Sequence, residues 1–362
     1  MRKLYLHVGV HRTATTSIQR FMRANFTVLL NKGYLYPYGV ARHNAVVGRV
    51  RYGTMTAEDL AQDLLRRMEA KGGHVQSVVL SDEDLSMIED MRIFASLRRH
   101  FEVKVVVSLR RQDLWLESWY LQNVKWQWDP SLAHVRFDEF YARRGEFFWI
   151  DYASRLAHYE AVFGAGAVVA GVFEEADMPL GPIDAFLAMI GISDQAGFGQ
   201  KLHHNSSLSP LASEFMRHLP LDEMEGPDRR VFEQACLALD EDLVTNGSKL
   251  VMSHPRRLAV MAAHATGNAA TAQRHFKRDV LFRAPLPEPE APLANADLPG
   301  DTEGLMRDFV APFVRTMGRQ MAILRLAAAD AAAEVAAEVA AAPAQNDRKR
   351  QGPKKDRVRP RT

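Results

Sequence analysis

Short apolar runs alternate with segments of helical periodicity through the first half of the chain. One run contains three consecutive valines at 105–107, as expected of a strand that is covered on both faces. Strands that alternate with helices are typical of a parallel, doubly wound sheet. The pattern predicts an α/β fold with strands over 4–8, 75–80, 103–109 and 167–173, and helices over 18–30, 58–70, 91–100, 114–125 and 183–190.

The second half of the chain changes character twice. Helical periodicity dominates from about residue 200 to 283, and five prolines then fall between 284 and 300. After residue 342 the sequence has eight Lys or Arg against two Asp, which is typical of disorder. We expect a domain over 1–283 with a helical C-terminal part, a proline-rich linker over 284–302, an alanine-rich helix over 303–342 and a basic tail over 343–362.

The C-terminal extension is a candidate interaction element. Its helix could pair with a partner helix or with a second copy of itself, which would make a homo-oligomer. Its basic tail could contact an anionic partner such as RNA or lipid, or could remain solvated with no fixed partner.

Composition argues against a disulfide-stabilised protein, a membrane-spanning protein and a nucleic-acid-binding protein. The single cysteine, Cys236, excludes an intramolecular disulfide, so we expect a reduced, cytoplasmic setting. No apolar run reaches the roughly 18–20 residues needed to span a bilayer. The N-terminus has the pattern of a strand and not of a signal peptide. The net charge of +2 indicates no strong affinity for nucleic acid.

The segment 9–17 lies between the first strand and the first helix. Backbone N–H groups and the positive end of the helix dipole converge at such a turn, which makes it an anion site. Arg12 and three hydroxyl groups, those of Thr13, Thr15 and Thr16, add donors suited to phosphate oxygens. The alternative is an ordinary strand-to-helix turn with a threonine cap.

This turn is not a Walker A loop. That motif needs G-x4-G-K-[ST], whereas Ala14 replaces the second glycine and Thr15 replaces the lysine. A nucleoside-triphosphate kinase is therefore disfavoured.

Residues 11–17, H-R-T-A-T-T-S, resemble the H-K-T-G-T-T-S signature of bacterial sulfotransferases. The resemblance implies a P-loop-like sulfotransferase fold. It also implies that Arg12, Thr13, Ala14, Thr15, Thr16 and Ser17 bind the 5′-phosphosulfate of 3′-phosphoadenosine-5′-phosphosulfate (PAPS). Arg12 stands where the family has lysine, and Ala14 where it has glycine. Alanine suits that position only if the backbone does not need a positive φ.

A second stretch, 105–120, resembles the strand and helix that hold the 3′-phosphate in that family. The resemblance assigns this role to Arg110, at the end of the strand, and to Ser118, eight positions later. The position agrees with the binding of ligands at the carboxyl edge of open α/β sheets. The alternative is a salt bridge between Arg110 or Arg111 and Asp113. Weaker similarities at 33–37, 205–209 and 268–282 extend the resemblance over 1–283.

Sulfuryl transfer needs a base for the acceptor proton and cations for the charge that develops on the leaving group. Arg12 is the candidate cation. Two residues are candidates for the base: Glu83, which follows the second strand, and His43, which follows the first helix. The alternative for Glu83 is an acidic helix start capped by Ser81, and for His43 a surface residue.

The sequence thus indicates a sulfotransferase that moves a sulfuryl group from PAPS to a hydroxyl or amine of a carbohydrate, a lipid or another small acceptor. No metal is expected. Two alternatives stay open, a P-loop small-molecule kinase and a catalytically inactive protein that binds PAP or PAPS. The departures at Arg12 and Ala14 make the inactive protein a serious alternative.

Overall fold

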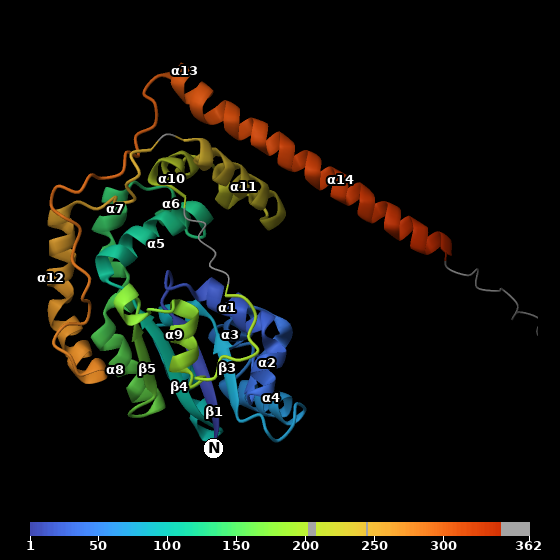
Figure 1. Cartoon of the computed structure of the whole chain (residues 1–362), viewed down its shortest axis with the longest axis vertical. Coiled ribbons are helices and arrows are strands. Elements are labelled where there is room, and N and C mark those ends of the chain that lie inside the picture. Colours follow the sequence, from blue (N-terminus) through green and yellow to red (C-terminus); the bar gives the residue numbers. More distant parts are fainter. Residues whose placement is uncertain (202–207, 244, 342–362) are drawn as a thin grey trace, which may run out of the picture.

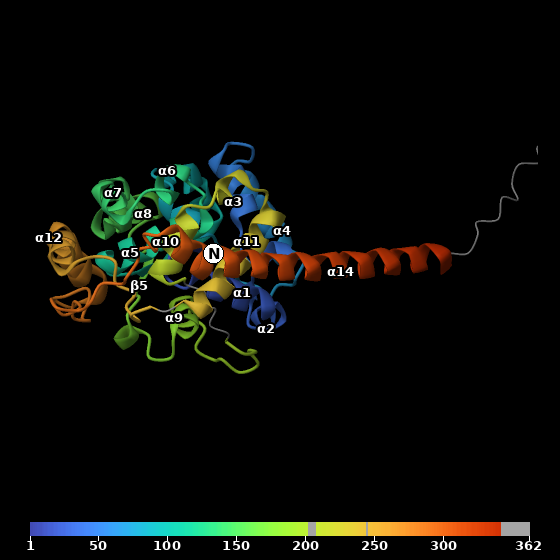
Figure 2. The ribbon, with the colours of Figure 1, turned by 90° about the horizontal axis from the view of Figure 1, so that it is seen from above.

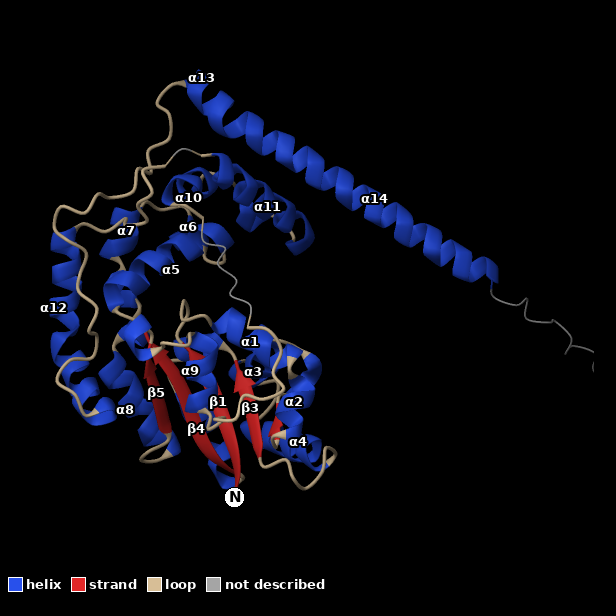
Figure 3. Cartoon of the chain, viewed as in Figure 1, coloured by secondary structure: helices blue, strands red, loops and turns tan. Residues whose placement is uncertain are grey.

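The computed structural model describes residues 1–201, 208–243 and 245–341, and Figure 3 shows a parallel sheet with helices around it. The strands follow the order β2-β3-β1-β4-β5, and every neighbouring pair is parallel. The chain first fills the sheet on one side of β1 and then crosses to the other side. Ligands of open α/β sheets bind at such a reversal, beyond the carboxyl ends of the strands. The strands are β1 (Arg2–Gly9), β2 (Tyr34–Leu35), β3 (Ser77–Ser81), β4 (Phe101–Leu109) and β5 (Val168–Val172).

Helices cover both faces of the sheet, so the predicted doubly wound α/β fold is confirmed (Figure 1). Alternate residues of β1 enter different apolar layers: Leu4 and Leu6 join the larger layer, and Tyr5 the smaller. The smaller layer is packed by α1 (Thr15–Ala24), α2 (Phe26–Asn31) and α9 (Pro182–Met189), and the larger by α3 (Asn44–Arg51), α4 (Ala57–Glu69) and α8 (Tyr152–Phe163), among others.

The structure differs from the sequence expectation in four places. The helix expected over 18–30 is two helices, because Asn25 ends α1 and bonds instead to the carbonyl of Phe21 and the N–H of Gly199. The segment expected as a helix over 91–100 is a run of 3₁₀ turns, η3 (Met91–Arg99). Periodicity did not predict α3 or the two-residue β2. In these segments, side-chain hydrogen bonds to the nearby backbone or a short length weaken the hydrophobic periodicity from which helices and strands are predicted.

A group of helices lies beyond the carboxyl edge of the sheet, where Figure 1 shows α5 to α7, α10 and α11 above the strands. The long α5 connects them to the sheet because it directly follows β4. Helix α12 packs along α5 and α8. The bounds are α5 (Gln112–Trp126), α6 (Pro130–Ala133), α7 (Phe137–Ala142), α10 (Pro210–Arg217), α11 (Gly226–Asp242) and α12 (His254–Thr271).

The C-terminal extension begins with an irregular segment. Residues 284–300 contain no helix or strand, as their proline content predicts. The expected helix over 303–342 corresponds to α13 (Thr302–Leu305), one π turn (Met306–Val310) and α14 (Ala311–Ala341). The basic tail over 343–362 lies outside the described residues. Among the described helices, none combines the length and the apolar character needed to cross a membrane.

Candidate functional site

The turn between β1 and α1 is wound tightly around the start of the helix. Gly9, Arg12 and Ala14 all have left-handed backbones, with φ of 69°, 71° and 61°. A Cβ on Gly9 would lie 2.8 Å from the Cγ2 of Thr15, so only glycine fits there. The first N–H groups of an α-helix have no partners within the helix, so those of α1 can bond to groups held at this turn.

Ala14 occupies a conformation that glycine adopts without strain. It precedes α1 with φ 61° and ψ 22°. The condition under which alanine would suit this position, the absence of a positive φ, is therefore not met. The methyl group costs about 1 kcal/mol in this region.

The loop hydroxyls have different environments. Thr13 is fully buried, and its Oγ1 donates to the carbonyl oxygen of Val10 at 2.6 Å, so it holds the loop closed. Thr15 and Ser17 are buried in the first turn of α1, whereas Thr16 is exposed. The indole Nε1 of Trp115 donates to the carbonyl oxygen of His11 at 2.8 Å. The loop is therefore tied to α5 through its backbone.

Two arginines meet at Ser118. Arg12 Nε donates to Ser118 Oγ at 2.6 Å, and Arg12 Nη1 to Gln122 Oε1 at 3.0 Å. Arg110 Nη1 donates to the carbonyl oxygen of Arg12 at 2.7 Å and approaches Ser118 Oγ to 3.4 Å. The structure thus brings together three of the predicted residues, one from the loop, one from the end of β4 and one from α5.

Burial and mutual repulsion act against the charged forms of the two arginines. Burial lowers the pKa of Arg12. Burial, and next the charge of Arg12, lower the pKa of Arg110 to about 10. Like charges held together in a low dielectric repel each other. A phosphate group would relieve that repulsion and accept several charge-assisted hydrogen bonds.

Tyr152 fixes the backbone of Arg110. Its hydroxyl donates to the carbonyl oxygen of Arg110 at 2.5 Å and accepts from the Arg110 N–H at 3.2 Å. Tyr152 is buried at the start of α8. The direction of the Arg110 side chain therefore depends on a residue 42 positions away, which periodicity cannot identify.

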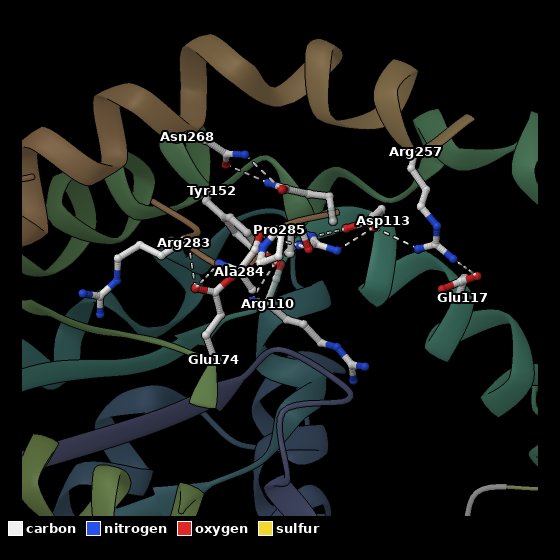
Figure 4. A network of polar contacts seen from close by, with 12 residues as sticks. Arg110, Asp113, Glu117, Tyr152, Glu174, Arg257, Asn268, Arg283, Ala284 and Pro285 are labelled. Carbon is white, nitrogen blue, oxygen red and sulfur yellow. Dashed lines mark hydrogen bonds and ion pairs between the residues drawn. The ribbon is translucent and has the colours of Figure 1, made fainter. Parts of the chain in front are cut away.

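A buried ionic network holds the start of α5 (Figure 4). Asp113 accepts from Arg111 Nε at 2.7 Å and from Arg257 Nη1 at 2.9 Å. Glu117, one turn later, accepts from Arg257 Nη2 and from the N–H of Met252, the latter at 2.7 Å. The alternative reading of a salt bridge to Asp113 thus applies to Arg111, but the pair is buried. In the sequence, the sign of this network is the presence of charged residues such as Asp113 and Glu117 inside an otherwise aromatic and apolar helix.

The same network reaches the segment after α12. Arg111 Nη1 donates to the carbonyl oxygens of Ala284 and Pro285, each at 2.8 Å. Glu174, just beyond β5, accepts from the Arg283 N–H at 2.8 Å. The side chains of Gln112 and Asn268 form a reciprocal amide pair, at 2.8 and 3.0 Å. The C-terminal part is therefore joined to the carboxyl ends of β4 and β5.

Glu83 lies beside the turn over residues 9–17, which we call the anion loop after its predicted role. A Cβ on Gly9 would be 3.1 Å from the Cβ of Glu83. Glu83 is 7% exposed. Its Oε2 accepts from Gln19 Nε2 at 2.6 Å, and its Oε1 is 3.4 Å from Arg42 Nη1. A carboxylate that is buried, oriented from two sides and adjacent to the loop is well placed to take a proton.

Arg42 organises the acidic residues on both sides of Glu83. It contacts Asp82 and Asp84, each at 2.7 Å. Burial raises the pKa of Asp82 to about 6 although Arg42 opposes the shift. Burial acts the same way on Asp84, but hydrogen bonding from His11 and the charge of Arg42 outweigh it and hold the pKa at about 2. The cluster therefore contains carboxylates of different proton affinity.

His43 is buried, and both of its ring nitrogens bond to the backbone. Nδ1 accepts from the Ser81 N–H at 2.9 Å, so the proton is on Nε2, which donates to the carbonyl oxygen of Pro37 at 3.0 Å. Burial lowers the pKa of His43 to about 4. The geometry therefore favours Glu83 over His43 as the proton acceptor.

Comparison with known proteins finds similarity that is weak or covers only part of the chain. No model of a known protein family matches the chain. An uncharacterized protein of Archaeoglobus fulgidus is 30% identical over 146 residues, which are 40% of this chain and 37% of that relative's length. A solved sulfotransferase from Alicyclobacillus acidocaldarius aligns over 77% of this chain and 98% of its own, with 15% identity and a TM-score of 0.42. Likeness at this level does not establish a shared function.

Replacing Ala14 by glycine should stabilise the protein. The left-handed backbone at this position strains alanine, so Ala14→Gly should raise the free energy of unfolding by about 0.5–1 kcal/mol. Urea denaturation at neutral pH measures the change. Ala142→Gly, at the end of α7, is the control and should be destabilising. A loss of stability in Ala14→Gly would show that the position is not strained.

Buried histidines should make the fold sensitive to acid. Burial lowers the pKa of His43 to about 4 and that of His7 to about 3, whereas unfolded histidine titrates near 6.5. Between these values the unfolded state binds more protons, so stability is full above about pH 6.5 and falls as the pH drops toward 4.

The variant His43→Gln should lose about 2 kcal/mol less than the wild type between pH 7 and pH 5, whatever its stability at pH 7. Urea unfolding at the two pH values measures this difference. Equal losses in both proteins would contradict the assignment of a depressed pKa to His43.

Proposed function

We propose that the protein transfers a sulfuryl group from PAPS to a hydroxyl or amine of a carbohydrate, lipid or other small acceptor. The convergence of Arg12 and Arg110 on Ser118, next to the anion loop, carries this proposal. PAPS has two anionic groups, a 5′-phosphosulfate and a 3′-phosphate. The loop at the start of α1, with Arg12, suits the first, and Arg110 with Ser118 suits the second.

The same observation separates this proposal from a kinase. ATP carries no 3′-phosphate, so it offers no anionic group to Arg110 at the end of β4. The loop also lacks the Walker lysine, since Thr15 occupies that position. A second, half-buried cation at the end of β4 therefore supports a 3′-phosphorylated nucleotide over a nucleoside triphosphate.

In the reaction, a bond forms between the sulfur and the acceptor oxygen or nitrogen, and the bond between the sulfur and the 5′-phosphate oxygen breaks. We assign Glu83 to accept the acceptor's proton, with Gln19 and Arg42 holding its carboxylate. Arg12 and the N–H groups at the start of α1 would stabilise the negative charge that develops on the leaving oxygen. His43 is given a positioning role, because it fixes the backbone at the end of β3.

An inactive protein that binds PAP or PAPS is the second candidate. The Arg12 guanidinium is bonded along α5 to Ser118 and Gln122. An arginine held in this way could retain nucleotide binding without assisting the departure of the leaving group. Binding and turnover must therefore be measured separately.

Nucleotide binding tests the cofactor site. Isothermal titration calorimetry with PAP should give micromolar affinity, and ATP with Mg²⁺ should bind more weakly. Arg110→Ala should weaken PAP binding by at least about tenfold, the value of one charge-assisted phosphate contact. The exposed Arg66→Ala is the matched control. Binding of ATP without binding of PAP would reject the proposal in favour of a kinase.

Turnover tests the role of Glu83. Labelled PAPS would be supplied with a panel of sugars, lipids and amines, and transfer would be followed by product mass. Glu83→Gln should lower the rate about 10²–10⁴-fold, as for loss of a general base, with PAP affinity retained. The exposed Glu69→Gln should leave the rate unchanged. If His43→Gln abolished transfer while Glu83→Gln retained it, the assignment of the base would be wrong. PAP binding without any transfer would favour the inactive protein.

A further inference from the structure

Helix α14 leaves the body of the protein. Its first turns are anchored, because Phe313 is buried against Phe215 of α10 and Phe232 of α11, with ring centroids 5.5 and 5.9 Å apart. From residue 321 to residue 330 every residue is exposed. Figures 1 and 2 show this part of α14 extending past the end of α11 as a straight rod.

One exposed face of α14 presents a short apolar centre between opposite charges. Arg319, Ile323, Leu326 and Asp330 follow one another at intervals of four, three and four residues, which places them on one side of the helix. Ile323 is 57% exposed and Leu326 is 67% exposed. Large aliphatic side chains exposed together on a projecting helix mark an interaction surface.

The order of these four residues suits pairing with an identical helix that runs in the opposite direction, because each charge then meets the opposite charge and each apolar residue meets the other apolar residue. If a second α14 lies antiparallel with its midpoint between residues 324 and 325, Arg319 faces Asp330 of the other copy. Ile323 then faces Leu326, and each contact occurs twice. A parallel pair would instead place Arg319 against Arg319 and Asp330 against Asp330. Charge therefore selects the antiparallel arrangement.

The surroundings of this face permit close approach. Ala322 and Ala329 flank Ile323 and Leu326, and small side chains allow two helix backbones to come close together. The four residues span 11 helical steps, about 16 Å.

We infer that α14 is a dimerisation element that pairs antiparallel with α14 of a second copy, through Arg319, Ile323, Leu326 and Asp330. This inference does not depend on the proposed function, because none of these residues lies near the anion loop or Arg110. A contact of this size makes a weak, concentration-dependent dimer.

Sedimentation velocity of the full chain tests the inference. Between roughly 1 and 200 µM, the range suited to a small interface, the protein should shift from monomer to dimer. Arg319→Glu alone and Asp330→Arg alone should each weaken dimerisation by about tenfold or more, because each places two like-charge pairs in the interface. The double variant Arg319→Glu/Asp330→Arg should restore the wild-type constant to within about threefold.

Arg325→Glu is the matched control, since it makes the same charge change on the same exposed rod but on another face. It should leave dimerisation unchanged. A chain that stays monomeric at every concentration would overturn the inference. So would equal weakening by Arg325→Glu and Arg319→Glu, or a double variant no better than the single ones. PAP titration of the same samples reports the nucleotide site separately.

Discussion

Two guanidinium groups lie close together where β1, β4 and α5 meet, and burial leaves their repulsion poorly screened. Arg110 and Arg12 share Ser118 as an acceptor. Such an arrangement requires the surrounding protein to hold both side chains in place against their repulsion. Tyr152 holds the backbone of Arg110 from α8, and the winding of the anion loop holds Arg12 from β1. The carboxylates of Asp113 and Glu117, one turn apart on α5, offset part of the positive charge of Arg110. The buried network around α5 is therefore best understood as support for a cationic site.

Backbone strain is found in the same site. Arg12 and Ala14 both adopt left-handed backbones within three residues of each other. Non-glycine residues persist in this conformation only where the surrounding structure enforces it. Here the hydrogen bonds of Thr13 to Val10 and of Trp115 to His11 do so. The loop thus keeps its shape by contacts that it makes with its own backbone and with α5.

The features that could be predicted from the sequence are those set by residues close together in the chain. The four principal strands could be predicted because each contains the apolar run expected of a strand covered on both faces. The resemblance to a known family singled out the anion loop and the pair of Arg110 and Ser118 because each is a local pattern of sequence, and their binding roles stay predictions. The break at Asn25 depends on an N–H supplied by Gly199, and the role of Tyr152 on its bonds to Arg110. The preference for Glu83 over His43 rests on backbone partners of His43 that only the folded chain reveals. Contacts between distant segments leave no periodic signal.

The bonds from Arg111 to the carbonyl oxygens of Ala284 and Pro285 join residues 173 and 174 positions apart. During synthesis, the anion loop leaves the ribosome well before its supports in α12 and in the segment after it. Closing so large a loop is slow relative to forming local turns. The sheet can thus assemble well before α5 is locked in position. Until the ribosome has passed residue 285, the nascent chain holds the residues of the anion site without the framework that fixes them.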